Sequence, residues 1–386
     1  MTQAPEAPAA AVRRLERAVA SRPREVALHQ QLAQALDRLV AGEGGQAELA
    51  AICREQPAAF TSQLYLARYA DRGDDLHAAV VAFTRAIRAA QERGFWFDDN
   101  STPAWLRDSV RAGMAVAHRG RIEVFTRWIQ PYVARYGADE LVRVGKCLGI
   151  WLGIEPLVLA DPRQRPSFLY MPGLPVEPVF ARSALPFADW YEAETEAIAA
   201  EARAVLAAPA EIQPFHYDVP EAERGKLTRG AWDAYFFYAD GERFDAHHAA
   251  CPVTSAGLAR LPLDHVRDHG PECCFSIMRP GSHILPHRGV TNMRAVLHLG
   301  LEIPEGCALS LVGVLEQHWQ RGKCFAFDDT FEHEAWNRSD TTRVVLLGDI
   351  WNPHLRQAER EVLAEMVATI GDFNRAIEVT TTPTPK

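Results

Sequence analysis

The stretch that decides the fold begins with Ser-Ile-Met-Arg-Pro-Gly-Ser-His at residues 276–283 and ends with Gly-Asp-Ile-Trp-Asn at residues 348–352. Within it lie His287, in Pro-His-Arg-Gly, and His333, in Phe-Glu-His-Glu, and Arg343 follows ten residues after the second histidine. Two imidazoles from separate segments, followed by an arginine on a β-branched run, indicate a non-haem iron site in a small β-barrel. Taken singly, each histidine fits a surface or core residue better, so the prediction rests on the whole set.

Short alternating runs, separated by Gly, Pro and Asp turns, fill this stretch. The strands that we predict cover residues 276–278, 292–303, 307–314, 323–327 and 342–351. Such short strands are typical of a jelly-roll barrel rather than a parallel sheet. Pro286 predicts an extended or loop backbone at His287, and His333 is expected in the loop that follows the strand at 323–327.

Side chains on a strand alternate between its two faces, so the predicted strands also predict neighbours. One face of the strand at 292–303 carries Arg294, Val296, His298 and Gly300. One face of the strand at 342–351 carries Arg343, Val345, Leu347 and Asp349. His283 lies four residues before His287, but prolines at 280 and 286 exclude the helix that would make this spacing a metal pair. We therefore predict a structural or supporting role for His283.

Length and composition limit the function further. A chain of 386 residues is long enough for two domains, and its 48% hydrophobic and 24% charged residues are ordinary for a globular protein. The net charge of -9 argues against a general binder of nucleic acid or anionic membranes. The seven cysteines form no CxxC pair, which predicts buried, reduced thiols. The chain begins without a signal-peptide pattern and contains no apolar run of roughly 18 residues, so we expect a cytoplasmic protein without a membrane span.

The first part of the chain is predicted to be helical. Residues 1–10 are rich in Ala and Pro and are expected to be disordered, and residues 11–155 form the predicted helical domain. A 34-residue repeat relates Leu15, Ala18 and Pro23 to Leu49, Ile52 and Pro57. Packing positions of a tetratricopeptide-like repeat are matched by Leu66, Ala67, Ala79, Phe83 and Ala86. The alternative is a generic helical bundle with a chance period. Stacked helices of this kind often bind a peptide or a partner protein.

Composition changes after the helical domain. Prolines cluster between residues 156 and 186, which we interpret as an irregular segment at the junction between domains. A helix is predicted over about 187–207, and Trp232–Tyr238 is predicted to be a strand with core aromatics. The predicted barrel domain covers residues 187–375, and residues 376–386 are expected to be a flexible tail.

Three segments resemble the aspartyl/asparaginyl β-hydroxylase family: His-Arg-Gly-Val-Thr-Asn at 287–292, His-Leu-Gly-Leu-Glu-Ile-Pro-Glu-Gly-Cys at 298–307, and the segment at 322–337 that contains Asp-Asp-Thr-Phe-Glu-His-Glu. The resemblance implies a double-stranded β-helix, a cupin-like jelly roll, with Fe(II), 2-oxoglutarate as cosubstrate and O₂. It also implies that His287 and His333 are the iron ligands. The carboxylate ligand usual two residues after the first histidine is absent here, where Gly289 stands, as in that family.

The same resemblance assigns the cosubstrate residues. Arg343 matches the residue that binds the far carboxylate of 2-oxoglutarate, for which a planar guanidinium is well suited. Ser276 matches a serine that supports the same carboxylate, and His298 matches a residue that contacts the cosubstrate near the metal. The family often has an arginine where this chain has Val296, and we predict that Arg294, on the same strand face, takes its place.

Three functions remain open from the sequence. The leading one is hydroxylation of the β-carbon of Asp or Asn in a peptide or protein, with the helical repeats recruiting the substrate. The second keeps the chemistry and acts on a free amino acid, a lipid or another small molecule. The third is a repeat scaffold whose barrel no longer turns over, against which the retention of His287, His333 and Arg343 counts.

Overall fold

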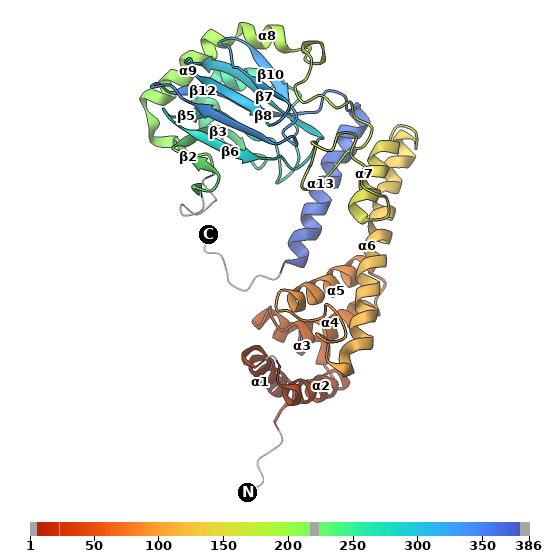
Figure 1. Ribbon diagram of the computed structural model, residues 1–386. Helices are drawn as coiled ribbons and strands as arrows, with labels where there is room; N and C mark the ends of the chain where they lie inside the picture. Colours follow the sequence, from red (N-terminus) through yellow and green to blue (C-terminus); the bar gives the residue numbers. More distant parts are fainter. Residues whose placement is uncertain (1–5, 23, 217–223, 379–386) are drawn as a thin grey trace. The chain divides into compact units, whose positions relative to one another are not determined.

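The computed structural model describes residues 6–22, 24–216 and 224–378 (Figure 1). By its packing the chain divides into two compact units, one made of the described residues within 1–131 and 370–386 and the other of those within 132–369. The division falls inside helix α6 (Arg107–Tyr136), close to Pro131. The sequence instead placed the end of the helical domain at residue 155. None of the described helices combines the length and the apolar character needed to cross a bilayer.

The first unit is built from helices, as predicted. They are α1 (Pro8–Ser21), α2 (Val26–Ala41), α3 (Gly45–Glu55), α4 (Phe60–Ala70) and α5 (Leu76–Gln91), followed by the short η1 (Ala104–Leu106) and by α6. Residues 8–10, within the segment expected to be disordered, thus belong to α1, and residues 1–5 lie outside the described part. The identification of these helices as tetratricopeptide-like repeats stays a prediction.

Small residues let these helices approach closely. Ala67 of α4 and Ala79 of α5 are buried where the two helices pack, and Phe83 is buried nearby. A Cβ atom added to Gly113 of α6 would lie 2.7 Å from the Phe83 ring, so the phenyl group occupies the space that this glycine leaves. The packing roles predicted for these alanines and for Phe83 agree with these positions.

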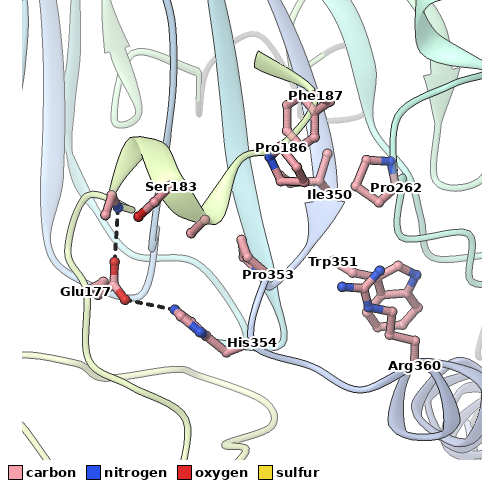
Figure 2. A pocket seen from close by; sticks show the side chains of 12 residues that line it. Glu177, Ser183, Pro186, Phe187, Pro262, Ile350, Trp351, Pro353, His354 and Arg360 are labelled. Carbon is pink, nitrogen blue, oxygen red and sulfur yellow. Dashed lines mark hydrogen bonds and ion pairs between the residues drawn. The ribbon is translucent and has the colours of Figure 1, made fainter. Parts of the chain in front are cut away.

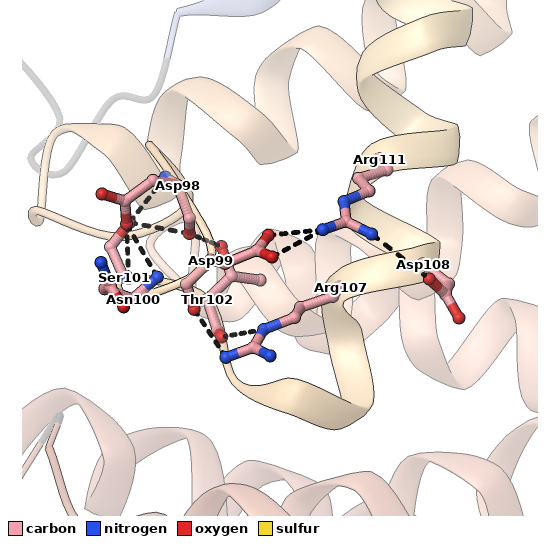
Figure 3. A network of polar contacts seen from close by, with 8 residues as sticks. All are labelled: Asp98, Asp99, Asn100, Ser101, Thr102, Arg107, Asp108 and Arg111. Atoms are coloured by element: carbon pink, nitrogen blue, oxygen red, sulfur yellow. Dashed lines mark hydrogen bonds and ion pairs between the residues drawn. The ribbon is translucent and has the colours of Figure 1, made fainter.

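The loop between α5 and η1 is held by its own polar groups (Figure 3). Asp98 Oδ1 accepts hydrogen bonds from the backbone amides of Asn100 and Ser101, and Ser101 Oγ accepts from the amides of Phe97 and Asp98. Arg111 of α6 forms an ion pair of 2.7 Å with Asp99. These side chains therefore close a turn, rather than cap the following helix.

The second unit contains two antiparallel sheets (Figure 1). The strands of the larger sheet follow the order β1 (Gln213–Pro214), β3 (Trp232–Ala239), β5 (Cys273–Met278), β12 (Arg343–Trp351), β7 (Arg294–Glu302) and β10 (Cys324–Phe327), with β4 (Glu242–Arg243) beside β3. The strands of the smaller sheet follow the order β2 (Thr228–Arg229), β6 (His283–His287), β11 (His333–Asn337), β8 (Cys307–Leu311) and β9 (Leu315–Gln317).

From β5 to β12 the chain passes back and forth between the sheets. The larger sheet takes β5, β7, β10 and β12, in the order β5-β12-β7-β10, and the smaller takes β6, β8, β9 and β11, in the order β6-β11-β8-β9. Two four-stranded sheets wound in this way form a double-stranded β-helix, which confirms the predicted fold. The predicted strands at 292–303, 307–314, 323–327 and 342–351 correspond to β7, β8, β10 and β12.

Alternation along the strands separates two cores, as expected for period two. Leu297 and Leu346 belong to a cluster that packs against α8 (Ala188–Ala193) and α9 (Thr195–Ala207). Val296 and Leu347, which are adjacent to these leucines in the two strands, belong to the cluster inside the barrel. The inner face also carries the predicted polar residues, so it is the face on which the site is built.

Irregular segments and the remaining helices complete the unit. The remaining helices are α7 (Val142–Leu152), η2 (Arg182–Ala184), η3 (Pro209–Glu211), α11 (Asp245–Ala250), α12 (Pro252–Leu258) and α13 (Gln357–Ile377). Residues 370–377 of α13 belong to the first unit. Arg143 of α7 forms a double hydrogen bond with the buried Glu359 of α13. The tail predicted from residue 376 includes the end of α13, and residues 379–386 lie outside the described part.

The proline-rich segment lies along the barrel. Its backbone donates from Arg165 to the carbonyl of Thr330, from Phe168 to that of Val290, and from Phe180 to that of Ala326. The segment is irregular, as predicted, and it fixes the loops that precede β7 and β11. Those two loops adjoin the pair of histidines.

Candidate metal centre and active site

The two histidines of the quoted stretch meet on neighbouring strands. His287 is the last residue of β6 and His333 the first residue of β11, and antiparallel pairing places them opposite each other. Their ring centroids are 4.1 Å apart. The extended backbone predicted at His287 is therefore correct, whereas His333 lies in a strand and not in the loop where the sequence placed it. The strand position fixes the second ring as firmly as the first.

Both imidazoles are oriented by backbone carbonyls. His287 Nδ1 lies 2.8 Å from the carbonyl oxygen of Leu285, and His333 Nδ1 lies 2.9 Å from that of Phe331. A carbonyl only accepts, so each Nδ1 carries the proton and each Nε2 presents a lone pair. Burial, followed by the proximity of His287, lowers the pKa of His333 to about 4. A neutral imidazole with a fixed Nε2 is the form that ligates a metal.

A carboxylate fills the space beside Gly289, two residues after His287. A Cβ atom on Gly289 would lie 2.0 Å from Cγ of Asp329 and 2.1 Å from each of its carboxylate oxygens. The Gly289 amide also donates to the Asp329 carbonyl, over 2.6 Å. The Asp329 carboxylate therefore stands where a ligand side chain at position 289 would stand.

The Asp329 carboxylate also fits a nearby cation. Its Oδ1 is buried and accepts no hydrogen bond from any residue that the structure describes. Within residues 6–22, 24–216 and 224–378 no three His, Cys, Asp or Glu side chains are grouped so as to hold a metal. The donor set is thus the predicted pair of histidines, with one buried carboxylate close to Gly289.

Arg343 and Ser276 lie together on the inner face of the larger sheet. Arg343 begins β12, is 1% exposed, and donates from Nη1 to the carbonyl of Ser276 (3.1 Å) and to its Oγ (3.3 Å). Trp232 Nε1 donates to the same Oγ over 3.0 Å. Because Ser276 Oγ accepts from both neighbours, its own proton is left to donate to a ligand.

The guanidinium of Arg343 is not neutralised by a neighbour. Burial lowers its pKa to about 10, so it stays charged near neutral pH. No carboxylate among the described residues forms an ion pair with it, and its buried Nε has no acceptor there. An isolated buried cation is costly, so this group fits an anionic ligand.

His298 faces the same space from β7. Trp319 Nε1 donates to His298 Nδ1 over 3.0 Å, which places the His298 proton on Nε2. Burial, followed by the charge of Arg343, lowers the pKa of His298 well below its usual value and keeps the ring neutral. The Trp319 ring also stacks on Arg343, with the guanidinium carbon 4.6 Å from its centroid. One tryptophan therefore positions both predicted cosubstrate residues.

Arg294 lines the site but is held by acids. Its Nη1 lies 2.8 Å from Asp349 Oδ2 and its Nη2 lies 3.3 Å from Asp329 Oδ2. The sequence predicted that Arg294 shares a strand face with His298 and that Asp349 shares a strand face with Arg343. It assigned Arg294 to the binding of the cosubstrate. The geometry instead makes Arg294 the link between two carboxylates.

A third carboxyl group lies behind this pair. Burial, followed by the charge of Asp349, raises the pKa of Asp264 well above its usual value, whereas the pKa of Asp349 is raised to about 6, mainly by burial. Asp264 thus holds its proton more tightly than a free carboxyl group does, while Asp349 forms the ion pair with Arg294.

The pocket around these groups has a volume of about 240 Å³. All six predicted site residues line it: Ser276, His287, Arg294, His298, His333 and Arg343. Trp232, Trp319, Asp329 and Asp349 also line it. The sequence assigned no role at the site to the two tryptophans or to Asp349, and for Asp329 it left open a role in orienting the ligands and a role in capping the turn. The signal for Asp349 was its place on the same strand face as Arg343. His283 is outside the lining and contacts Glu334 over 2.6 Å, which agrees with its predicted supporting role.

A second pocket of about 530 Å³ lies elsewhere on the barrel unit (Figure 2). Its polar groups satisfy one another: Glu177 accepts hydrogen bonds from His354 Nε2 (2.8 Å) and from the amide of Ala181 (3.0 Å). Pro262, Trp351 and other apolar residues form most of the remaining wall. It contains none of the predicted site residues.

The chain is similar to known hydroxylases. The family model described as aspartyl/asparaginyl beta-hydroxylase matches residues 192–353. Mouse aspartate beta-hydroxylase domain-containing protein 2 is 30% identical over 254 residues, which cover 64% of this chain and 71% of that protein. The ornithine lipid ester-linked acyl 2-hydroxylase of Rhizobium tropici is 36% identical over 46% of this chain and 61% of that protein. Human aspartyl/asparaginyl beta-hydroxylase is 35% identical over 38% of this chain, but this spans only 19% of the human protein.

Proposed function

Since the chain belongs to the aspartyl/asparaginyl β-hydroxylase family, we propose that it is an Fe(II)- and 2-oxoglutarate-dependent dioxygenase that hydroxylates an unactivated C–H bond. The observation that carries this proposal is the buried, un-neutralised guanidinium of Arg343, which lines the same pocket as the paired imidazoles of His287 and His333. One pocket thus offers lone pairs for a metal and a cation for a carboxylate.

Each residue has a defined task in this proposal. When bound, Fe(II), 2-oxoglutarate and O₂ supply the oxidising chemistry that no amino-acid side chain offers. His287 and His333 would hold the metal through Nε2. Arg343 and Ser276 would hold the far carboxylate of the cosubstrate, and His298 would donate from Nε2–H to the cosubstrate near the metal. The apolar inner face of the barrel keeps water from the reacting carbon.

Two substrate classes are candidates. The β-carbon of Asp or Asn in a peptide is the class that the sequence predicts, and it is named in the human relative. The acyl chain of a lipid is named in the Rhizobium tropici relative. A protein partner on the helical repeats and a cytoplasmic location remain parts of the proposal, and the net charge of -9 still argues against nucleic acid as a partner.

Formation of succinate without an added substrate tests the proposal. We expect the full-length protein to convert 2-oxoglutarate slowly to succinate in air when Fe(II) is supplied. His287→Ala and His333→Ala should each reduce this rate to background, because each removes a metal ligand. His283→Ala is the matched control, since His283 lies four residues from His287 but outside the pocket, and it should keep the rate. Equal succinate formation by His333→Ala and the unchanged protein would show that the ligand assignment is wrong.

A further inference from the structure

We infer that the substrate of this pocket presents an uncharged hydrocarbon segment, such as a fatty-acyl chain, to the reacting centre, and not a side chain that carries a carboxylate. The inference rests on the proposed function, because it concerns the substrate of the same site. Three features of the described residues carry it: the partners of the arginines, the apolar wall near His298, and the apolar rim of the pocket.

Two of the three arginines that line the pocket in the described part of the chain are already engaged on its inner side. Arg343 is the ligand for the cosubstrate carboxylate. Arg294 uses Nη1 for Asp349 and Nη2 for Asp329, at 2.8 and 3.3 Å, and is flanked by both acids. Its charge is therefore balanced before any substrate enters.

The third arginine, Arg288, is directed toward the backbone. Its Nη1 donates to the carbonyls of Arg163 (2.8 Å) and Thr330 (3.3 Å), and its Nη2 lies 3.7 Å from Glu332. This side chain ties the proline-rich segment to the loop before β11. Its guanidinium is thus engaged by two backbone carbonyls and has the Glu332 carboxylate beside it.

Among the described residues that line the pocket, the arginines do not outnumber the acids, so no arginine is left over for a second carboxylate. The acids that line it equal the arginines in number: Glu272, Asp329 and Asp349 against Arg288, Arg294 and Arg343. A divalent metal and the dianionic cosubstrate cancel each other. A substrate carboxylate would thus be an unpaired buried charge, which costs several kcal/mol or shifts to its protonated form.

The wall beside His298 is apolar. Val296 shares the inward face of β7 with His298, is buried, and belongs to the core inside the barrel. The apolar residues that line the pocket include Ile284, Val296, Leu309, Phe327, Ala335 and Leu347. A wall of this kind gains by contact with methylene groups and offers no partner to a carboxylate or carboxamide.

The size and the rim of the pocket fit a chain that enters only in part. A volume of about 240 Å³ is below the 300–1,000 Å³ of typical small-molecule sites, so with the cosubstrate in place there is room for only a short segment. Val290, which lines the pocket, is 41% exposed, and Phe168, whose amide donates to the Val290 carbonyl, is 36% exposed. These apolar side chains offer contact to the hydrocarbon that stays outside.

Two probes test the inference with the full-length protein: esters of fatty acids of several chain lengths in nonionic detergent micelles, and a synthetic peptide with one central aspartate. The readouts are the increase in succinate formation over the uncoupled rate and a gain of one oxygen by mass spectrometry. We expect an ester to produce both effects and the peptide neither. A hydroxylated peptide would overturn the inference, and so would the failure of every ester while uncoupled turnover proceeds. Absence of uncoupled turnover would instead contradict the proposed function.

A pair of variants at one position sharpens the test. Val296→Arg places a guanidinium in the apolar wall and should lower kcat/KM for the ester at least about tenfold, whereas Val296→Leu, which keeps the wall apolar, should change it far less. Thermal unfolding of both variants shows whether they fold. An ester kcat/KM that is the same in a folded Val296→Arg and in the unchanged protein would contradict the inference.

Discussion

Gly289 and Asp329 share one space at the metal centre. Because a Cβ atom on Gly289 would meet the Asp329 carboxylate at 2.0–2.1 Å, Gly289→Ala should displace that carboxylate and destabilise the protein by about 1–3 kcal/mol. The measurement is thermal unfolding, together with Fe(II) affinity. Gly289→Ala combined with Asp329→Gly removes the clash and should recover most of the lost stability. If the double variant is no more stable than Gly289→Ala, the two residues do not compete for this space.

The carboxylate can also be exchanged between the two positions. Asp329→Gly should weaken Fe(II) binding, because it removes the buried negative charge beside the histidines. Gly289→Asp combined with Asp329→Gly returns a carboxylate to the same place from the other loop and should restore part of the affinity. Fe(II) titration under argon measures both variants. An affinity in the combined variant no better than in Asp329→Gly would show that the place of the carboxylate does not matter.

Trp319 sets the tautomer of His298 through one hydrogen bond of 3.0 Å. Trp319→Phe keeps a ring for Arg343 to stack on but removes the N–H donor, so the His298 proton is no longer confined to Nε2. We expect KM for 2-oxoglutarate to rise roughly fivefold, the equivalent of a hydrogen bond of about 1 kcal/mol. The matched control is Trp336→Phe, since Trp336 is buried outside the pocket, and it should leave KM unchanged.

Residue types and spacing could predict the chemistry at this scale but not the contacts of charged groups. His287, His333, Ser276, His298 and Arg343 are all found in one pocket. Arg294 was assigned to the cosubstrate because it shares a strand face with His298. Nothing in a strand pattern shows that Asp329, from a loop, and Asp349, from a neighbouring strand, converge on its guanidinium.

At the scale of elements, a buried acid links two helices of the first unit. Glu16 of α1 accepts hydrogen bonds from the amide (3.0 Å) and the hydroxyl (2.6 Å) of Ser62 near the start of α4. Burial raises the pKa of Glu16 from 4.5 to about 7. The folded pKa is above the unfolded one, so the stability that this group contributes is fully present below about pH 4.5 and is lost as the pH rises through 7.

The loss predicted for Glu16 amounts to roughly 3 kcal/mol between pH 4.5 and pH 8. Thermal unfolding followed by helical circular dichroism, at several pH values, measures it. Glu16→Gln keeps an acceptor for Ser62 but does not titrate, so its stability should vary less with pH over this range. The same pH dependence in the variant and in the unchanged protein would contradict the assignment.

Strand periodicity was the most informative pattern for the elements. It placed β7 and β12 and their inward faces, because each strand alternates over nine residues. It could not place His333, because β11 is only five residues long and its first residue is fixed by pairing with β6 and β8, which a local pattern does not contain. The short β2, β4 and β9 also depend on partners distant in the sequence.

For the whole molecule, composition and repeats predicted a helical part before a barrel, and this order is found. The position of the division between the two units was harder to predict from the sequence. Helices α6 and α13 each contribute to both units, so helical periodicity continues across the boundary. All seven cysteines are free and buried, as predicted from the lack of paired spacing. The identity of the substrate depends on charge balance in the pocket, which no single motif contains.

The most direct test of the metal centre is anaerobic titration of the full-length protein with Fe(II) and 2-oxoglutarate. A chelate of the cosubstrate on iron gives a weak visible absorption band, and we predict that this band saturates at one equivalent of iron per chain. It should be absent in His333→Ala and should need a higher 2-oxoglutarate concentration in Arg343→Lys, which loses the planar fork. No band in the unchanged protein, or the same band in His333→Ala, would contradict the account.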